Sequence, residues 1–226
     1  MSPDELNQLE NDLRAPALNV RIAALNALAE RPANVAVPIL QRLTEESSFL
    51  LRRLAVMGLG NHAPDATALD TLKTLLDAET DSNVMAEVAN SLYEFGDVSI
   101  PLLAQLFTAN SNWLVRQTVL SILQETQHYD VLLDVSLEAL EDPTQTVKET
   151  AILSLRQVLR SPLQPQALSA LTQLAKSSVW RDRWRAATAL TGCNHPQAVE
   201  LLAELKTDEN HYVVAAALDA SMGNGL

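Results

Sequence analysis

Two sets of residues in this chain have types and spacings that could do chemistry. Cys193 and His195 lie two residues apart, as metal ligands or a thiol and its base can. A zinc site needs more ligands than this pair, and no second cysteine or nearby histidine pair completes one, so we interpret Cys193 as structural. Acidic pairs such as Glu45-Glu46 and Glu141-Asp142 are interpreted as solvated surface at helix ends or loops. The sequence therefore predicts no metal site and no catalytic residue, and it favours a non-catalytic protein.

Residues 179–185 carry a different kind of chemistry, suited to recognition. The segment holds two of the three tryptophans together with three arginines. Trp180 and Trp184 are four residues apart, which makes them neighbours on a helix. Tryptophan and arginine are the residue types most enriched in binding hot spots. A basic, aromatic cluster in an acidic chain is therefore a candidate site for holding a partner.

A repeat along the whole chain positions these residues. Its best copy reads Val-Arg-x-x-Ala-x-x-Ala-Leu, and we number each copy from 0 at its first residue. The copies begin at Val20, Leu51, Val84, Val115, Val147, Asp182 and Val213. Successive starts are 31, 33, 31, 32, 35 and 31 residues apart, a period that is typical of solenoids. Asp182 stands where the best copies have Val or Leu, and it lies inside the tryptophan–arginine segment.

Each copy is expected to form the second of two antiparallel helices. Positions 0, +4, +7 and +8 share one helix face, and leucine rows such as Leu133, Leu137 and Leu140 indicate the preceding helix. Proline and glycine between these segments mark helix boundaries. We predict an all-α, right-handed α-solenoid of about seven helix pairs, forming one array over residues 1–226. The predicted repeats are residues 2–30, 31–61, 62–95, 96–126, 127–160, 161–192 and 193–226.

Two rows of polar positions follow from this helix geometry. Basic residues at +1, among them Arg52, Lys148 and Arg183, lie near the buried face, where a charged group must find a partner. We interpret them as an internal ladder that pairs with adjacent repeats; a basic stripe that binds an acidic partner is the alternative. At Asp182 two readings stay open: the segment is a binding hot spot, or one tryptophan fills space left by the preceding loop while Asp182 pairs with a neighbouring arginine.

Positions +2, +6 and +9 point away from the core and are expected to form the inner, concave wall of the superhelix. Solenoids commonly hold a protein segment on that wall, although a solvated face without a partner is the alternative. The predicted partner-binding residues are Arg53, Asn90, Tyr93, Trp113, Gln117, Arg156, Trp180, Arg181, Trp184 and Arg185.

Composition narrows the choice of partner. The formal net charge of −12 repels a phosphate backbone, so we expect no nucleic acid. The longest apolar runs are far shorter than a membrane span, so we expect no membrane insertion. A single cysteine excludes an internal disulfide framework and favours a cytoplasmic location.

The repeat resembles the HEAT-repeat family over nearly the whole chain. Residues 194–202, Asn-His-Pro-Gln-Ala-Val-Glu-Leu-Leu, are similar to the opening of the HEAT-like repeats of phycobilisome lyases. Gly96-Asp97, followed by Ile-Pro-Leu-Leu at residues 100–103, is a partial copy of the same opening. Residues 111–116, Ser-Asn-Trp-Leu-Val-Arg, resemble a stretch of cyanobacterial members, including phycobilisome-degradation proteins of the NblB type.

Three functions are compatible with these observations. The leading hypothesis is a non-catalytic protein–protein interaction scaffold or adaptor without a cofactor. The resemblance implies a second one, a phycobilisome-related factor, either bilin lyase-like or active in phycobilisome turnover, whose partner is a phycobiliprotein and whose ligand is a linear tetrapyrrole. In that case arginines would pair with the bilin propionates and aromatic rings would stack on the pyrroles. A third is an assembly factor for another complex, in which the lone Cys193 could not ligate an iron–sulfur cluster by itself.

Overall fold

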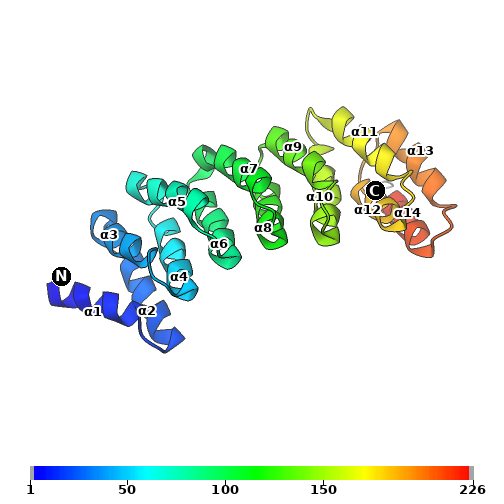
Figure 1. The fold of residues 1–226 in the computed structure, drawn as a ribbon. Coiled ribbons are helices and arrows are strands. Elements are labelled where there is room, and N and C mark those ends of the chain that lie inside the picture. The colour runs from blue at the N-terminus through cyan, green and yellow to red at the C-terminus, as the bar shows by residue number, and fades with distance from the viewer. Residues whose placement is uncertain (1–2, 224–226) are drawn as a thin grey trace. The chain divides into compact units, whose positions relative to one another are not determined.

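The computed structural model describes residues 3–223, and all the regular elements within that range are helices. The outermost residues of the first and last predicted repeats, 1–2 and 224–226, lie outside the described residues. Fourteen α-helices and one short 3-10 helix follow one another along the chain (Figure 1). The chain divides into two compact units, residues 1–119 and 120–226.

The first unit contains three complete helix pairs and the start of a fourth. Its helices are α1 (Pro3–Leu13), α2 (Leu18–Ala29), α3 (Ala33–Leu43), α4 (Phe49–Gly60), α5 (Ala66–Ala78), α6 (Ser82–Tyr93), the 3-10 helix η1 (Gly96–Ser99) and α7 (Ile100–Ala109). The boundary between the units falls within α8 (Trp113–Gln124). Asp65 and Asp81 start α5 and α6, because each carboxylate accepts hydrogen bonds from two main-chain N–H groups that the helix leaves unpaired.

The second unit contains the three remaining pairs. Its helices are α9 (Tyr129–Ala139), α10 (Gln145–Val158), α11 (Gln164–Leu174), α12 (Trp180–Ala189), α13 (Pro196–Leu205) and α14 (His211–Gly223). Each predicted repeat thus contains one pair of helices. The prediction of an all-helical fold of about seven helix pairs is confirmed. The handedness of the superhelix and the single array over residues 1–226 stay predictions.

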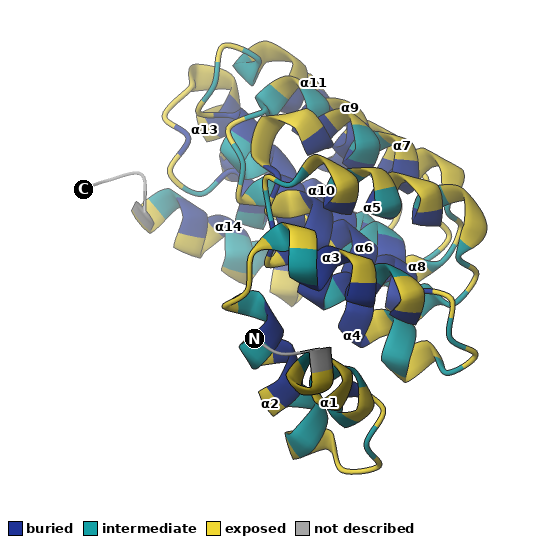
Figure 2. Ribbon diagram, turned by 90° about the vertical axis from the view of Figure 1, so that its left-hand side faces the viewer, coloured by how far each residue is buried: buried dark blue, intermediate teal, exposed yellow. Residues whose placement is uncertain are grey.

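Each unit has two layers, because the second helix of a pair packs on the second helix of the next pair. In the first unit α4 packs on α6, while α3 packs on α5. In the second unit α12 packs on both α10 and α14. Figure 2 shows the buried residues on the sides of the helices that face one another, and exposed residues on the outer sides of the first helices.

Small residues let the layers approach closely. Gly58, at +7 of its repeat, lies against Leu25 and Leu40, and a Cβ atom there would be only 2.6 Å from Leu40 Cδ2. Both leucines are buried. The expected leucine rows are mainly buried, but in the row on α9 Leu133 is buried, Leu140 is partly exposed and Leu137 is 39% exposed.

Candidate functional site

The outward positions of the second helices form what we call the second-helix face, defined by positions +2, +6 and +9 of each repeat. In the repeat that contains α12 these positions are Trp184 and Thr188 on the helix and Thr191 just after its end, all partly exposed. On α14 the +2 and +6 positions are Ala215 and Asp219, both exposed. The helical periodicity therefore places these side chains outside the core, as the repeat predicts.

Three aromatic rings meet at the N-terminal ends of α12 and α14. Trp180 stacks on Tyr212, with ring centroids 5.5 Å apart and planes tilted by 23°. Trp184 lies 6.0 Å from Trp180 and 6.4 Å from Tyr212. We call Trp180, Trp184 and Tyr212 the aromatic cluster. Tyr212 remains 52% exposed, so the cluster is a surface feature and does not belong to the core.

Two arginines cover the cluster. The Arg185 guanidinium lies 3.9 Å from the Trp184 ring centroid, and that of Arg181 lies 5.3 Å from the Trp180 ring. Arg185 also donates two hydrogen bonds to Glu149 on α10, at 2.8 and 2.6 Å. Arg181 is exposed and forms no ion pair with the residues that the structure describes. Of the two cations, Arg181 is therefore the one available to a partner.

Asp182 has a structural role beneath this cluster. Its carboxylate is 2% exposed and accepts hydrogen bonds from Lys148 Nζ and Ser177 Oγ, both at 2.9 Å. Asp182 thus pairs with a basic residue, but the predicted arginine partner is wrong, because the partner is Lys148 at +1 of the preceding repeat. The departure from the repeat at Asp182 is therefore explained by packing.

The +1 residues form the internal ladder that the sequence predicts. Arg52 makes two hydrogen bonds with the Glu79 carboxylate, and Arg183 does the same with Asp208. In each case the acid lies in the loop of the next helix pair, just before its second helix. The hydrogen bonds from Arg183 hold the pKa of Asp208 below its ordinary value. These cations are therefore engaged within the protein and do not form a free basic stripe.

The same arginines also clamp the loop before their own helix. Arg52 and Arg183 each donate to the carbonyl oxygen six residues earlier, in Glu46 and Ser177. Arg21 makes the equivalent bond to Ala15. Each clamp satisfies a loop carbonyl that the helices leave unpaired.

The predicted residues of the first unit are more dispersed. Arg53 on α4 forms an ion pair with Glu87 on α6, at 2.9 Å. Asn90 and Tyr93 are exposed on α6. Trp113, 51% exposed, is the first residue of α8, and Gln117 lies one turn later, partly exposed. Within the described part of the first unit these five residues include no aromatic pair in ring contact.

A pocket of ≈ 200 Å³ opens on the second-helix face between α12 and α14. It is lined by Trp184, Thr188, Thr191, Tyr212, Ala215, Ala216 and Asp219. Sequence reasoning found Trp184 but missed Tyr212 and Asp219, which belong to a weak copy of the repeat. Counting +6 from Val213 was the signal that could have identified Asp219.

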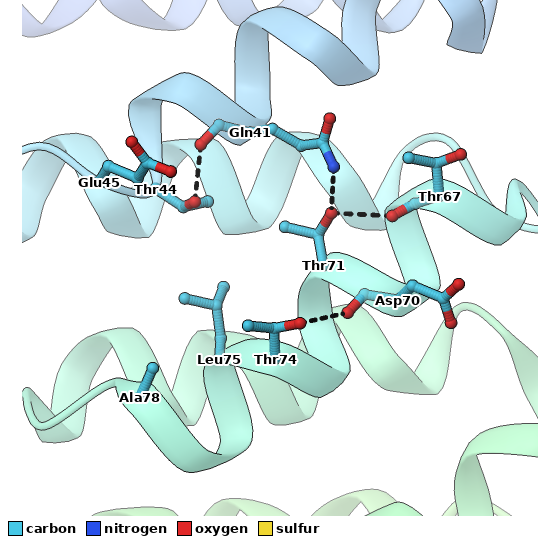
Figure 3. Close-up of a pocket in the computed structure, with 9 residues that line it drawn as sticks. All are labelled: Gln41, Thr44, Glu45, Thr67, Asp70, Thr71, Thr74, Leu75 and Ala78. Atoms are coloured by element: carbon cyan, nitrogen blue, oxygen red, sulfur yellow. Dashed lines mark hydrogen bonds between the residues drawn. The ribbon is translucent and has the colours of Figure 1, made fainter.

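Two other pockets lie away from the aromatic cluster. One of ≈ 520 Å³ lies between α3 and α5 on the first-helix side (Figure 3). Its Thr71 and Thr74 hydroxyls donate to carbonyl oxygens of their own helix, and Gln41 donates to Thr71. A smaller one of ≈ 70 Å³ is lined by Arg156, together with the loop that contains Cys193. Arg156, predicted for the wall, thus lies apart from the aromatic cluster.

Cys193 and His195, the pair whose spacing could suit catalysis, have structural roles instead. Cys193 is buried, and His195 caps α13, where its Nδ1 accepts a hydrogen bond from the Gln197 N–H. Within residues 3–223 no three His, Cys, Asp or Glu side chains gather closely enough to hold a metal ion. Over the same range no helix is both long and apolar enough to cross a bilayer.

Comparison with known proteins defines the family. A model of HEAT repeats matches residues 36–124 and 100–183. The chain belongs to the HEAT-repeat family. HEAT-repeat solenoids commonly bind proteins, and the fold is typical of interaction scaffolds. No curated protein matches the sequence.

Several solved structures share the HEAT fold. The YibA protein of Escherichia coli is 14% identical, with a TM-score of 0.66 over 100% of this chain and 82% of that one. Kap121p bound to RanGTP is 17% identical, with a TM-score of 0.61 over 99% of this chain and 29% of that one. The CpcE–CpcF complex of phycocyanin lyase from Nostoc sp. PCC7120 is 20% identical, with a TM-score of 0.50 over 98% and 88%. At these identities the similarity establishes the α-solenoid fold alone.

Proposed function

We propose that this protein is a non-catalytic interaction scaffold that holds a segment of another protein on the second-helix face of residues 120–226. The observation that carries the proposal is the aromatic cluster of Trp180, Trp184 and Tyr212, which lies beside a pocket instead of in the core. Large aromatic side chains that are already held in place by neighbours can bind a partner at a low cost in conformational entropy. A cytoplasmic location stays a prediction from the single cysteine.

The test is affinity purification from native cells with the wild-type chain and with the double variant Trp184→Ala, Arg181→Ala. We expect proteins captured by the wild type to be lost with the variant. A matched control, Leu137→Ala with Lys176→Ala, removes one exposed apolar side chain and one exposed cation elsewhere in the same unit. If both double variants capture the same proteins as the wild type, the aromatic cluster is not the partner-binding site.

Loss of folding must be distinguished from loss of binding. Trp184 is only partly exposed, so its removal also takes away packing against its neighbours. Tyr212→Ala removes a more exposed ring from the same cluster and should disturb the fold less. Circular dichroism of each variant checks the helix content before binding is compared.

A second function, supported by one observation, is a phycobilisome-related factor that binds a phycobiliprotein and a linear tetrapyrrole. Arg181 is exposed beside a tryptophan–tyrosine stack, which suits a propionate and a pyrrole ring. Mixing the chain with phycocyanobilin and recording the visible spectrum tests it. A shift that Arg181→Ala abolishes supports the proposal; an unchanged spectrum and no co-migration with phycobiliproteins on gel filtration oppose it.

A further inference from the structure

The pocket between α12 and α14 has a chemical character that goes beyond a general docking surface. Its volume of ≈ 200 Å³ suits one inserted side chain better than a whole helix. Two aromatic rings, of Trp184 and Tyr212, line it together with the small side chains of Ala215 and Ala216. A single side chain with an apolar stem fits this volume and this lining.

The hydroxyl oxygens of Thr188 and Thr191, two residues that line the pocket, can act as acceptors. Thr188 donates its hydroxyl proton to the Trp184 carbonyl at 3.0 Å, and Thr191 donates to the Thr188 carbonyl at 2.8 Å. Each hydroxyl oxygen keeps lone pairs that can accept a further hydrogen bond. Helix α12 ends at Ala189, beside these threonines, and the carbonyl groups of a helix C-terminus carry partial negative charge.

Asp219 adds a full negative charge to the same wall. It is exposed, and it forms no hydrogen bond or ion pair with any residue that the structure describes. Two arginines of α12 already have acidic partners: Arg185, which lies over the Trp184 ring, is bonded to Glu149, and Arg183 is bonded to Asp208. Arg181 lies over Trp180 and does not line the pocket.

These observations together define the occupant. We propose that the pocket takes a lysine or arginine side chain from the bound segment of the partner protein. The methylene stem lies against Trp184 and Tyr212, and the cationic head group reaches Asp219 and the two threonine oxygens. Aromatic faces attract cations as well as methylene groups, so both parts of the side chain gain from this site. The inference rests on the proposed function, because it names the chemistry of the segment that the scaffold holds.

Selection from a random library of 12-residue peptides displayed on phage tests the inference without a known partner. The full chain and the variant Asp219→Asn are used as separate targets. Asp134→Asn is the matched control, because Asp134 is exposed on α9 of the same unit and lies outside the pocket. We expect peptides selected on the wild type and on Asp134→Asn to share a lysine or arginine. Those peptides should bind Asp219→Asn at least tenfold more weakly, and peptides with glutamine in place of the shared cation should lose binding to the same degree.

The outcomes separate this inference from the proposed function. Peptides that depend on Trp184 or Tyr212 but carry no shared cation, or that bind Asp219→Asn as well as the wild type, would overturn the inference and leave the scaffold proposal standing. Peptides whose binding is unaffected by Trp184→Ala and Tyr212→Ala would overturn both for this face. A far-ultraviolet circular dichroism spectrum confirms that each target is folded.

Discussion

The Lys148 ammonium group lies 2.9 Å from the buried carboxylate of Asp182, so a charge pair joins two successive repeats where most copies have an apolar residue. The sequence alone left open whether Asp182 signalled a binding site or a packing solution. Its contacts with Lys148 and Ser177 show the packing solution. The evidence for the aromatic cluster is the contact between its three rings.

Replacing both members of this pair should be tolerated better than replacing one. Asp182→Val leaves Ser177 and Lys148 without their acceptor, and we expect the free energy of unfolding to fall by about 1–2 kcal/mol. The double variant Lys148→Met, Asp182→Val should recover much of that loss, because apolar replacement of a whole buried ion pair is often neutral. Urea denaturation measures both. A double variant no more stable than Asp182→Val would contradict this account.

Arg183 should be among the most sensitive residues of the second unit. Its side chain and that of Asp208 are 11% and 9% exposed, and Arg183→Ala leaves the carboxylate without its two charged donors. Breaking such a nearly buried pair costs about 3 kcal/mol. Arg183→Lys should lose less, since one donor remains. If the midpoint of urea unfolding is the same for both variants as for the wild type, the Arg183–Asp208 pair contributes nothing to stability.

Gly58 should not accept a larger side chain. Alanine gains about 1 kcal/mol of helix propensity over glycine, but its Cβ would overlap the buried methyl groups of Leu40 and Leu25. Overpacking of this kind costs about 1–3 kcal/mol, so we expect Gly58→Ala to lower the melting temperature. The companion substitution Leu40→Ala makes room. In a double-mutant cycle the two changes should therefore couple; strict additivity would show that the close approach is relaxed in solution.

His62 should make stability depend on pH in the first unit. Burial lowers the pKa of its imidazole below the ordinary value of 6.5, although the charge of Asp65 and the Leu28 main chain oppose this. Ring atom Nε2 is buried without a hydrogen-bond partner among the described residues. As the pH falls below about 6.5, the unfolded chain binds a proton that the folded chain does not, so the free energy of unfolding decreases.

The matched variant for this effect is His62→Asn, which removes the titrating group. Urea unfolding between pH 7.5 and 5.5 should show a smaller decrease for His62→Asn than for the wild type. Parallel pH profiles would mean that His62 keeps its ordinary pKa in the folded state.

The fold could be predicted because its cause is local. Positions 0, +4, +7 and +8 recur in each copy, and a helix must bury the face that they share. The +1 ladder was predictable for the same reason, since a cation near that face needs a partner. Leu137 was not, because its exposure depends on how α9 lies against its neighbours and not on its own helical period.

The site could be predicted only in part, because it is assembled between repeats. Trp180 and Trp184 are visible in the sequence as neighbours on one helix. Tyr212, one residue before the repeat start at Val213, joins them only through the packing of α14 against α12, whereas Asp219 could have been identified as +6 of its repeat. The ion pair between Arg185 and Glu149 also forms between two repeats. It engages a cation that the sequence analysis had assigned to partner binding.

The pairs Arg53–Glu87 and Glu149–Arg185 join the same two positions, +2 of one repeat and +3 of the next, with opposite polarity. In the first unit the cation precedes the acid, and in the second unit the acid precedes the cation. Exchanging the later repeats of these two pairs would therefore set arginine against arginine and glutamate against glutamate. The charges at +2 and +3 therefore restrict which repeat can follow which. A chimera with its repeats in another order would need the residues at +2 and +3 exchanged together.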